Sequence, residues 1–335
     1  MNEVICIGSS SKDIFFPVAG GKILNTPEEL TSQKKLAFEL GAKFQADNIY
    51  EVPGGCAANV AQGLSRLKIK TACYTKIGND HTGKWIRKEL KKEGVDVRFL
   101  QVDRSCRSDL SAIIVDRKNK EHLIFFNRDA NKNLELNRRV LKRTKKLFVS
   151  ALNGDWENHF DVLLEISQSN NIGVYFNPGQ RNIKDNPAKI FEMIKKTEIL
   201  ILNKDEAIEI LQNNEIEKNP DNLNNEVFLV KCLNDMGARI VALTDGDRGA
   251  WLFDGKNVFK AKSKADKIVD TLGAGDSFSS GFLAGILSGE SIDNSLRWGI
   301  SNSLSVIRHY GAKRGLLDKK SILEKFSKVK LEKLN

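Results

Sequence analysis

The sequence has few of the features of membrane, secreted or metal-binding proteins. No stretch approaches the ~18 consecutive apolar residues that a membrane-spanning helix needs. The first residues, Met1–Cys6, lack the charged start and the apolar run of a signal peptide. The 5 cysteines are widely spaced without a Cys-x-x-Cys pair, and the 4 histidines show no metal-ligand spacing, which excludes a disulfide framework and a zinc site. We therefore expect a cytoplasmic protein with reduced thiols and no membrane partner.

The composition is that of an ordinary globular protein with a surplus of positive charge. The 335 residues are 41% hydrophobic and 29% charged, which suits two domains or one large α/β domain. The formal net charge of +10 favours anionic partners such as a nucleotide or a phosphorylated metabolite. The basic residues are dispersed, as in residues 138–146 and after Lys319, and aromatic residues are not regularly interleaved with them. Such clusters are typical of solvated helix faces, so nucleic acid is not expected as a partner.

Short apolar runs rich in β-branched residues alternate with segments of helical periodicity. The strands are apolar throughout instead of alternating with polar residues, which is typical of a parallel sheet covered on both faces. The sequence therefore predicts an α/β fold with a central, mainly parallel sheet. Strands are expected near residues 4–8, 148–150, 174–176, 199–202 and 240–243, and helices near 57–67, 160–166, 190–194 and 207–211.

Two segments near the start of the chain break this alternation. Residues 14–53 contain a Gly-Gly pair and a polar stretch before Ile49-Tyr50-Glu51-Val52. Residues 97–127 contain strand-like runs at 111–115 and 123–126 with no helix between them. We predict that these two β-rich insertions pair into a small sheet that acts as a lid over the main sheet.

The segment Ile268–Phe278 is the strongest candidate for a ligand site. An apolar strand end runs into the turn Gly273-Ala274-Gly275 and then into a helix. Glycines at such a turn let the backbone approach a ligand, and the free N–H groups and the helix dipole favour an anion. Asp276, in the first helical turn, would either face that anion or simply cap the helix, and the segment alone does not distinguish these roles.

Two further positions fit ligand binding at the same edge of a sheet. Pro53–Ala61 is a second glycine turn that opens a helix, and Asn59 in its first turns can both donate and accept hydrogen bonds. Asp13 follows the first strand, at the carboxyl end where open α/β sheets commonly bind ligands. An ordinary turn with a surface asparagine would produce the same pattern around Asn59.

The segment Gly78–Lys84 resembles a phosphate-binding P-loop only in part. Its glycines and lysine have Walker A spacing, but Trp85 stands where a Ser or Thr hydroxyl must bind Mg²⁺. We therefore predict a structural role for this segment. The sequence also lacks a Gly-x-Gly-x-x-Gly dinucleotide motif and a Gly-x-Ser-x-Gly nucleophile elbow.

Four motifs in order make the sequence similar to the ribokinase-like, or PfkB, carbohydrate kinases. Asp270–Asp276 matches the C-terminal signature of that family in full. Gly54–Ala61, followed by Lys76–Gly83, matches the N-terminal signature. Between them, Asn203–Glu206 resembles the family's Asn-x-x-Glu motif and Thr244–Gly249 its Thr-x-Gly-x-x-Gly motif.

The resemblance extends from Asp13 to about Gly311 and implies the architecture of the whole chain. A single ribokinase-like α/β domain is expected over residues 1–315, built as a three-layer sandwich with a small β-sheet lid from about 14–53 and 97–127. Residues 316–335 are expected to form a basic C-terminal tail.

The resemblance also implies an ATP-dependent phosphotransferase that acts on a hydroxymethyl group of a sugar or nucleoside. Asp276 would accept the hydroxyl proton, and the amides of Gly273, Ala274 and Gly275 would form an anion hole for the charge that develops during transfer. Phosphoryl transfer depends mainly on positioning and electrostatic stabilisation, which agrees with an anion site at this turn. The residues implied to hold substrate hydroxyls are Asp13, Gly55 and Asn59.

Cofactor residues follow from the same resemblance. Asn203 and Glu206 would organise Mg²⁺ and its waters near the phosphates, although the cap and first turn of a helix would explain the same pair. Asp270 would belong to a K⁺-binding loop that some members have. The residues implied to line the ATP site are Thr244, Gly246 and Gly249, with Asn302 beside the adenine.

The sequence leaves the acceptor open between sugars, sugar acids, sugar phosphates and nucleosides such as adenosine. We expect a sugar kinase, with a nucleoside kinase or a non-catalytic sensor of the same fold as alternatives. The intact Asp276 and Gly273–Gly275 turn argue against the sensor. Arg128, after a lid strand, either contacts the substrate or a phosphate on it, or lies on the surface. An exposed edge of the lid sheet could support a homodimer.

Overall fold

The central layer of the protein is a large sheet with helices on both faces. The computed structural model describes residues 2–28, 34–46, 48–119, 121–262, 265 and 268–334. Within these residues the large sheet has the strand order β17-β16-β15-β14-β13-β12-β11-β1-β6. The strands from β14 to β6 in that order are parallel, whereas β15, β16 and β17 pair antiparallel. The bounds are β1 (Asn2–Ile7), β6 (Thr71–Tyr74), β11 (Thr144–Val149), β12 (Gly173–Phe176), β13 (Ile199–Asn203), β14 (Ile240–Thr244), β15 (Ala250–Phe253), β16 (Val258–Lys262) and β17 (Lys330–Leu334).

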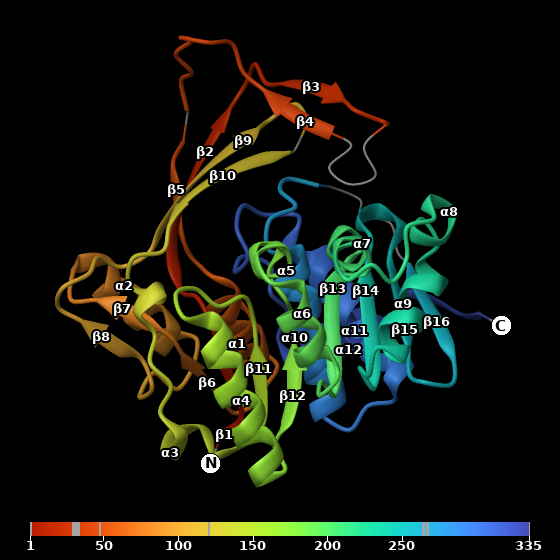
Figure 1. The fold of residues 1–335 in the computed structure, drawn as a ribbon. Coiled ribbons are helices and arrows are strands. Elements are labelled where there is room, and N and C mark those ends of the chain that lie inside the picture. Colours follow the sequence, from red (N-terminus) through yellow and green to blue (C-terminus); the bar gives the residue numbers. More distant parts are fainter. Residues whose placement is uncertain are drawn as a thin grey trace.

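Alternate residues of the parallel strands point into two separate cores. Ile5 and Ile7 of β1 face one core, whereas Val4 and Cys6 face the other. All four are fully buried, as expected for strands covered on both sides. This arrangement confirms the three-layer α/β sandwich (Figure 1).

Each core is closed by its own set of helices. The helices that bury residues in the first core are α3 (Arg138–Leu141), α4 (Trp156–Asn170), α5 (Gln180–Asp185), α6 (Pro187–Ile194), α7 (Lys204–Asn213), α8 (Pro220–Leu223) and α9 (Glu226–Asp235). Those of the second core are α1 (Cys56–Arg66), α2 (His81–Lys92), α10 (Ala274–Leu287), α11 (Ile292–Val306) and α12 (Lys319–Lys325). Short 3₁₀ turns are η1 (Asn131–Asn133), η2 (Gly246–Arg248) and η3 (Phe326–Lys328).

The two β-rich segments contribute to a small sheet that stands above the carboxyl ends of the parallel strands (Figure 1). Its strand order is β10-β9-β2-β5, with β2 (Ser11–Val18), β5 (Tyr50–Gly54), β9 (Leu110–Asp116) and β10 (His122–Asn127). Phe15, Val52 and Ile113 form its buried side and pack against Leu272 and Tyr310. This contact places the small sheet directly over the start of α10.

Not every part of the expected insertions joins the small sheet. The strand β8 (Gln101–Asp103) pairs with β7 (Lys76–Gly78), and β3 (Lys22–Asn25) pairs with β4 (Lys34–Ala37) as a separate hairpin. Residues 29–33 and 47 of the first insertion and 120 of the second lie outside the described residues, as does residue 335 of the expected tail.

The end of the chain differs from a basic tail. Ile322 of α12 is fully buried in the second core. Beyond it, β17 pairs with β16 and becomes the edge of the large sheet. Lysines on a short edge strand, such as Lys330 and Lys333, discourage further strand pairing.

The segment that precedes α10 differs from the sequence prediction. Ile268–Asp270 is not a strand end: the N–H groups of Val269 and Asp270 donate to the carbonyl of Ile307, at 2.8 and 3.3 Å, so the end of α11 holds this segment. In the part of the chain that the structure describes, no helix has the length and apolarity needed to span a membrane.

Candidate active site

Helix α10 begins at a glycine turn beneath the small sheet. Gly273 has a φ of 76°, in the left-handed region that favours glycine, and a Cβ atom there would lie 2.5 Å from the Cα of Ala312. The N–H group of Ala274 donates to the carbonyl of Thr271 at 3.2 Å, whereas those of Gly273 and Gly275 have no acceptor among the described residues. Two of the three amides predicted for the anion hole are therefore free to bind an anion.

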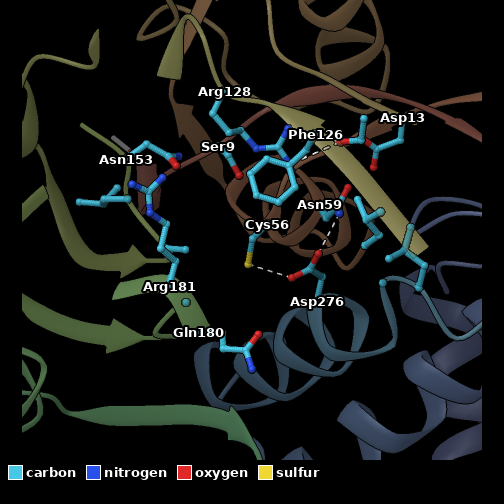
Figure 2. Close-up of a pocket in the computed structure, with 18 of the residues that line it drawn as sticks. Ser9, Asp13, Cys56, Asn59, Phe126, Arg128, Asn153, Gln180, Arg181 and Asp276 are labelled. Atoms are coloured by element: carbon cyan, nitrogen blue, oxygen red, sulfur yellow. Dashed lines mark hydrogen bonds between the residues drawn. The ribbon is translucent and has the colours of Figure 1, made fainter. Parts of the chain in front are cut away.

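Asp276, in the first turn of α10, is held by two side chains of another helix. Cys56 donates its S–H to Oδ1 and Asn59 donates from Nδ2 to Oδ2, each at 2.8 Å (Figure 2). The two donors are three residues apart on α1 and so share one face of that helix. The carboxylate is thus turned toward α1, and α10 has no side-chain cap hydrogen bond. Burial raises the pKa of Asp276, and the two hydrogen bonds offset part of that rise.

A cavity of about 300 Å³ lies between the small sheet and the ends of the parallel strands. Its volume is at the lower end of small-molecule sites. The predicted substrate residues Asp13, Gly55 and Asn59 line it together with Gly273 and Asp276. The other lining residues are Ser9, Cys56, Ser111, Ile113, Ile124, Phe126, Arg128, Ala151, Leu152, Asn153, Gly179, Gln180, Arg181, Asn182 and Leu272.

Asp13 on β2 is a nearly buried carboxylate, with 8% of its surface exposed. Ser11 donates to its Oδ1 at 2.7 Å. Burial raises the pKa of Asp13, while hydrogen bonds from Ser11 and Ser111 and the charge of Arg128 lower it. A Cβ atom on Gly54 would lie 1.8 Å from Oδ2 of Asp13, so this glycine makes room for the carboxylate.

Gly55 and Asn59 complete this side of the cavity. Gly55 has a φ of 91°, and a Cβ atom there would lie 2.5 Å from the carbonyl oxygen of Ser9. Asn59 is 7% exposed, and its Oδ1 is buried without a hydrogen-bond partner among the described residues. That oxygen is an available acceptor for a ligand hydroxyl.

Arg128 lies on the wall of the same cavity and not on the open surface. Its side chain is 19% exposed, and its guanidinium lies 4.6 Å from the centre of the Phe126 ring. It donates to Oγ of Ser111 at 3.3 and 3.4 Å, and its Nε is 3.9 Å from Oδ2 of Asp109. Contact between Arg128 and a substrate stays a prediction.

A second cavity, of about 200 Å³, meets the first at the start of α10. Gly273 and Asp276 line both cavities. The other lining residues of the second cavity are Asn177, Ile201, Leu202, Asn203, Glu206, Thr244, Gly275 and Ser279. Three of the predicted Mg²⁺ and ATP residues therefore share a cavity that is separate from the predicted substrate residues.

Asn203 and Glu206 form a capping box at the start of α7. The N–H of Glu206 donates to Oδ1 of Asn203 at 2.8 Å, and the N–H of Asn203 donates to Oε2 of Glu206 at 3.0 Å. Burial, with the negative charges of Glu209, Asp276 and Asp205, raises the pKa of Glu206 to about 8. A cation beside this carboxylate would supply the missing positive charge. Within the described ranges, no three His, Cys, Asp or Glu side chains are grouped to hold a metal ion by themselves.

Thr244 ends β14 and lines the second cavity, whereas Gly246 and Gly249 in the following turn do not. Gly249 has a φ of 105°, and a Cβ atom there would lie 2.3 Å from the carbonyl oxygen of Ala261, so it is needed for packing on β16. Gly246 has a φ of 46° and no neighbouring atom within 4 Å of a Cβ position. Nucleotide contact at these glycines stays a prediction.

The polar groups of Asn302 are all engaged within the protein. It is fully buried, and Nδ2 donates to the carbonyl of Ser277 at 2.8 Å and to Oγ of Ser280 at 3.1 Å. Its Oδ1 accepts from the N–H of Leu317 at 2.9 Å. The side chain joins α10 to α11 and lines neither cavity, and a place beside the adenine stays a prediction.

Asp270 is fully buried and braces the loop before α10. Its Oδ1 accepts from the N–H of Leu272 at 3.0 Å and its Oδ2 from the N–H of Gly311 at 3.2 Å. Nδ1 of His122 on β10 lies 3.7 Å from Oδ1. Burial raises the pKa of Asp270. A part in a K⁺ loop stays a prediction.

The segment with partial Walker A spacing is organised around Asp80. Asp80 caps α2 by accepting from the N–H of Gly83 at 2.7 Å, and it also accepts from the N–H and Oγ of Ser108 at 2.8 and 2.7 Å. Lys84 is exposed, and no residue of the segment 78–84 lines either cavity. The geometry supports the predicted structural role.

Sequence analysis missed several residues of the two cavities. Cys56 contacts Asp276, and Asn177 lies 3.2 Å from the Cys56 sulfur. Both positions could have been noticed in the sequence. Cys56 follows a glycine turn, and Asn177 follows β12 at the carboxyl end of that strand. Phe126 and Arg181 gave no signal, because only the folding of the small sheet and of α5 brings them to the cavity.

The family of the chain is decided by a match to a sequence profile. Residues 24–319 match the profile described as pfkB family carbohydrate kinase. The protein belongs to this family. The ribokinase-like resemblance and the predicted phosphotransferase activity are thereby confirmed.

Individual relatives agree with the family. An ATP-dependent 6-phosphofructokinase of Thermoanaerobacterium thermosaccharolyticum is 27% identical over 308 residues, which cover 88% of this chain and 91% of the relative. A nucleoside kinase of Methanocaldococcus jannaschii is 24% identical over 99% of both chains. The structure of a Burkholderia thailandensis nucleoside kinase in complex with inosine matches the fold with a TM-score of 0.78 at 17% identity, covering 97% of this chain and 96% of that one. The protein is thus a sugar or nucleoside kinase that transfers phosphoryl groups from ATP.

Proposed function

We propose that the protein transfers the γ-phosphoryl group of ATP to a hydroxymethyl group of a sugar, with Asp276 as the base. The observation that carries this proposal is that the two cavities share Gly273 and Asp276. A sugar in the first cavity and the ATP phosphates in the second would meet at this carboxylate. Direct phosphoryl transfer requires the two reactants to be held at such a meeting point.

Asp276 is suited to accept the hydroxyl proton. Burial raises its pKa, which brings the carboxylate closer to the neutral range in which a general base is most effective. The free N–H groups of Gly273 and Gly275 lie at the positive end of α10 and would stabilise the charge on the group in transfer.

The first cavity offers the groups that a sugar needs. Asp13 can accept hydroxyl hydrogens, and Oδ1 of Asn59 is an acceptor without a partner. Ile113, Ile124 and Phe126 give the small sheet an apolar face toward the cavity. The small sheet would therefore act as a lid that excludes water from the transfer.

Mg²⁺ would reach the second cavity with ATP. Glu206 would hold it through water, because burial and the charges of neighbouring acids raise its pKa, an effect that a cation beside it would offset. When bound, the ion would neutralise negative charge on the phosphates.

A nucleoside kinase of the same fold is the second candidate. The M. jannaschii nucleoside kinase matches 99% of both chains, and Phe126 offers a ring, 58% exposed at the cavity, on which a base could stack. A sugar is preferred because the relatives also include the 6-phosphofructokinase and a protein of Archaeoglobus fulgidus named an uncharacterized sugar kinase, which is 30% identical over 76% of this chain.

ADP release in a coupled assay tests the proposal. The enzyme is supplied with Mg·ATP and, separately, with neutral sugars, sugar acids, sugar phosphates and nucleosides. The highest kcat/KM for a sugar or sugar derivative supports the proposal, and the highest for a nucleoside replaces it with the second candidate. Binding of ATP and a sugar, seen as thermal shifts, without turnover of any acceptor would point to a sensor.

Asp13→Asn locates the acceptor site. Loss of charge-assisted hydrogen bonds worth about 1.5–3 kcal/mol should raise the acceptor KM roughly 10–100-fold, with the KM for ATP unchanged. Asp161→Asn, at an exposed site on α4, is the matched control. A rise in the KM for ATP with normal acceptor kinetics would reverse the two cavity assignments.

A further inference from the structure

The thiol of Cys56, the first residue of α1, stands between two hydrogen-bond acceptors. Its Sγ lies 2.8 Å from Oδ1 of Asp276 and 3.2 Å from Oδ1 of Asn177. Nδ2 of Asn177 donates to the carbonyl of Ile201 at 2.8 Å, so the amide oxygen is the atom that faces the thiol. The single hydrogen of the thiol can therefore be donated to the carboxylate or to the amide.

We propose that Cys56 is a positioning residue for Asp276, whose carboxylate it holds jointly with Asn59 in the orientation that accepts the hydroxyl proton. This inference rests on the proposed role of Asp276 as the base. Each donor reaches a different oxygen, so the carboxylate cannot rotate without losing a hydrogen bond (Figure 2). Catalytic groups need such restraint, because a displacement of about 1 Å can cost roughly 10²-fold in rate.

The site favours the protonated thiol that this role requires. Burial and the negative charges of Asp276 and Glu206 raise the pKa of Cys56 well above that of an ordinary thiol, although a hydrogen bond with Ser150 lowers it in part. A protonated thiol is a poor nucleophile and a poor metal ligand, but it keeps a hydrogen to donate. The environment therefore suits a hydrogen-bond donor and not a reactive cysteine.

Asn177 gives the thiol hydrogen a second position during the reaction. Once Asp276 has accepted a proton from the sugar, the S–H group can turn about the Cβ–Sγ bond toward the amide oxygen of Asn177. The donor is then never left unpaired in this partly buried site, which would be costly. A serine hydroxyl at position 56 could make the same two bonds, whereas alanine could make neither.

Kinetics of Cys56→Ala and Cys56→Ser test the role with Mg·ATP and the best acceptor. Cys56→Ala should lower kcat about tenfold, equivalent to about 1.4 kcal/mol, with both KM values changed less than about twofold. Cys56→Ser should keep kcat within about threefold of the wild type. Cys232→Ala, on α9 away from both cavities, is the matched control. A wild-type kcat in Cys56→Ala, or equal losses in the Ser and Ala variants, would overturn the inference.

Asp276→Asn separates failure of this inference from failure of the proposed function. If Asp276→Asn keeps the wild-type kcat, the base assignment itself is wrong. If Asp276→Asn is inactive while Cys56→Ala is fully active, only the positioning role is wrong.

Thiol alkylation gives a readout that does not depend on turnover. Burial and the charge of Asp276 both raise the pKa of Cys56, so Asp276→Asn removes one of the two causes and should speed the reaction of Cys56 with iodoacetamide several-fold, as followed by mass spectrometry. An unchanged rate would show that the two groups do not interact.

Discussion

Replacing Asp276 with asparagine removes the proposed base while keeping its shape. The carboxylate accepts from Cys56 at one oxygen and from Asn59 at the other. An asparagine at position 276 accepts only through its amide oxygen, which would turn toward Asn59. Its NH₂ group would then face the Cys56 sulfur, whose hydrogen can move to Asn177. Both cavities should therefore survive the change.

The effects on stability and on rate differ greatly in size. Weakening the charge-assisted hydrogen bond from Asn59 costs about 1.5–3 kcal/mol, but the variant no longer keeps a partly buried carboxylate away from water. These opposing effects should leave the free energy of unfolding within about 1 kcal/mol of the wild type. A positioned base contributes roughly 10²–10⁴-fold to the rate, so kcat should fall at least about 10²-fold.

The kcat, the KM for ATP and the melting temperature are measured on one preparation of each protein. Asp293→Asn is the matched control, because Asp293 also lies in the first turn of a helix but lines neither cavity. We expect Asp276→Asn to lose turnover with a near-normal melting temperature and ATP KM, and the control to change in none of them. Retained turnover in Asp276→Asn would refute the base assignment and leave Asp276 with a structural role.

Three further outcomes follow from the structure. Lys84→Ala should change the KM for ATP less than about threefold, because this exposed lysine lines neither cavity; a larger rise in steady-state kinetics would show that the segment binds phosphate. Asn302→Ala leaves the N–H of Leu317 without its acceptor, so it should lower the free energy of unfolding by about 1–3 kcal/mol in urea titrations. The KM for ATP of the folded variant should be unchanged. Normal stability with a raised KM for ATP would instead place Asn302 at the nucleotide. Folded Glu206 keeps its proton from its ordinary pKa of 4.5 up to about 8, whereas the unfolded chain releases it, so this carboxyl costs stability increasingly as pH rises through that window. The melting temperature of Glu206→Gln should therefore exceed that of the wild type above pH 8 and equal it below pH 4.5. A difference in melting temperature of the same size above pH 8 and below pH 4.5 would contradict the raised pKa.

The layers of the fold could be predicted from the sequence because they depend on local patterns. A parallel strand buried on both faces is apolar at every position, as Val4–Ile7 and Ile199–Leu202 are, and their shortness and β-branched residues distinguish them from a buried helix. The turns at Gly54–Gly55 and Gly273–Gly275 were also predictable. At most of these positions a side chain would collide with neighbouring atoms or strain the backbone, so the glycines themselves marked the site.

Contacts between distant parts of the chain were decided only by the tertiary structure. Asp276 meets Cys56 and Asn59, which lie 220 and 217 positions earlier, because the strand order places α1 beside α10. The same packing buries Asn302 between helices, although the family resemblance implies a nucleotide contact for it. Periodicity and turn residues report which face of an element is buried, whereas the partner of each buried polar group depends on how the layers pack. The family motifs therefore located the site, and the packing of α1 against α10 determined which side chains hold its carboxylate.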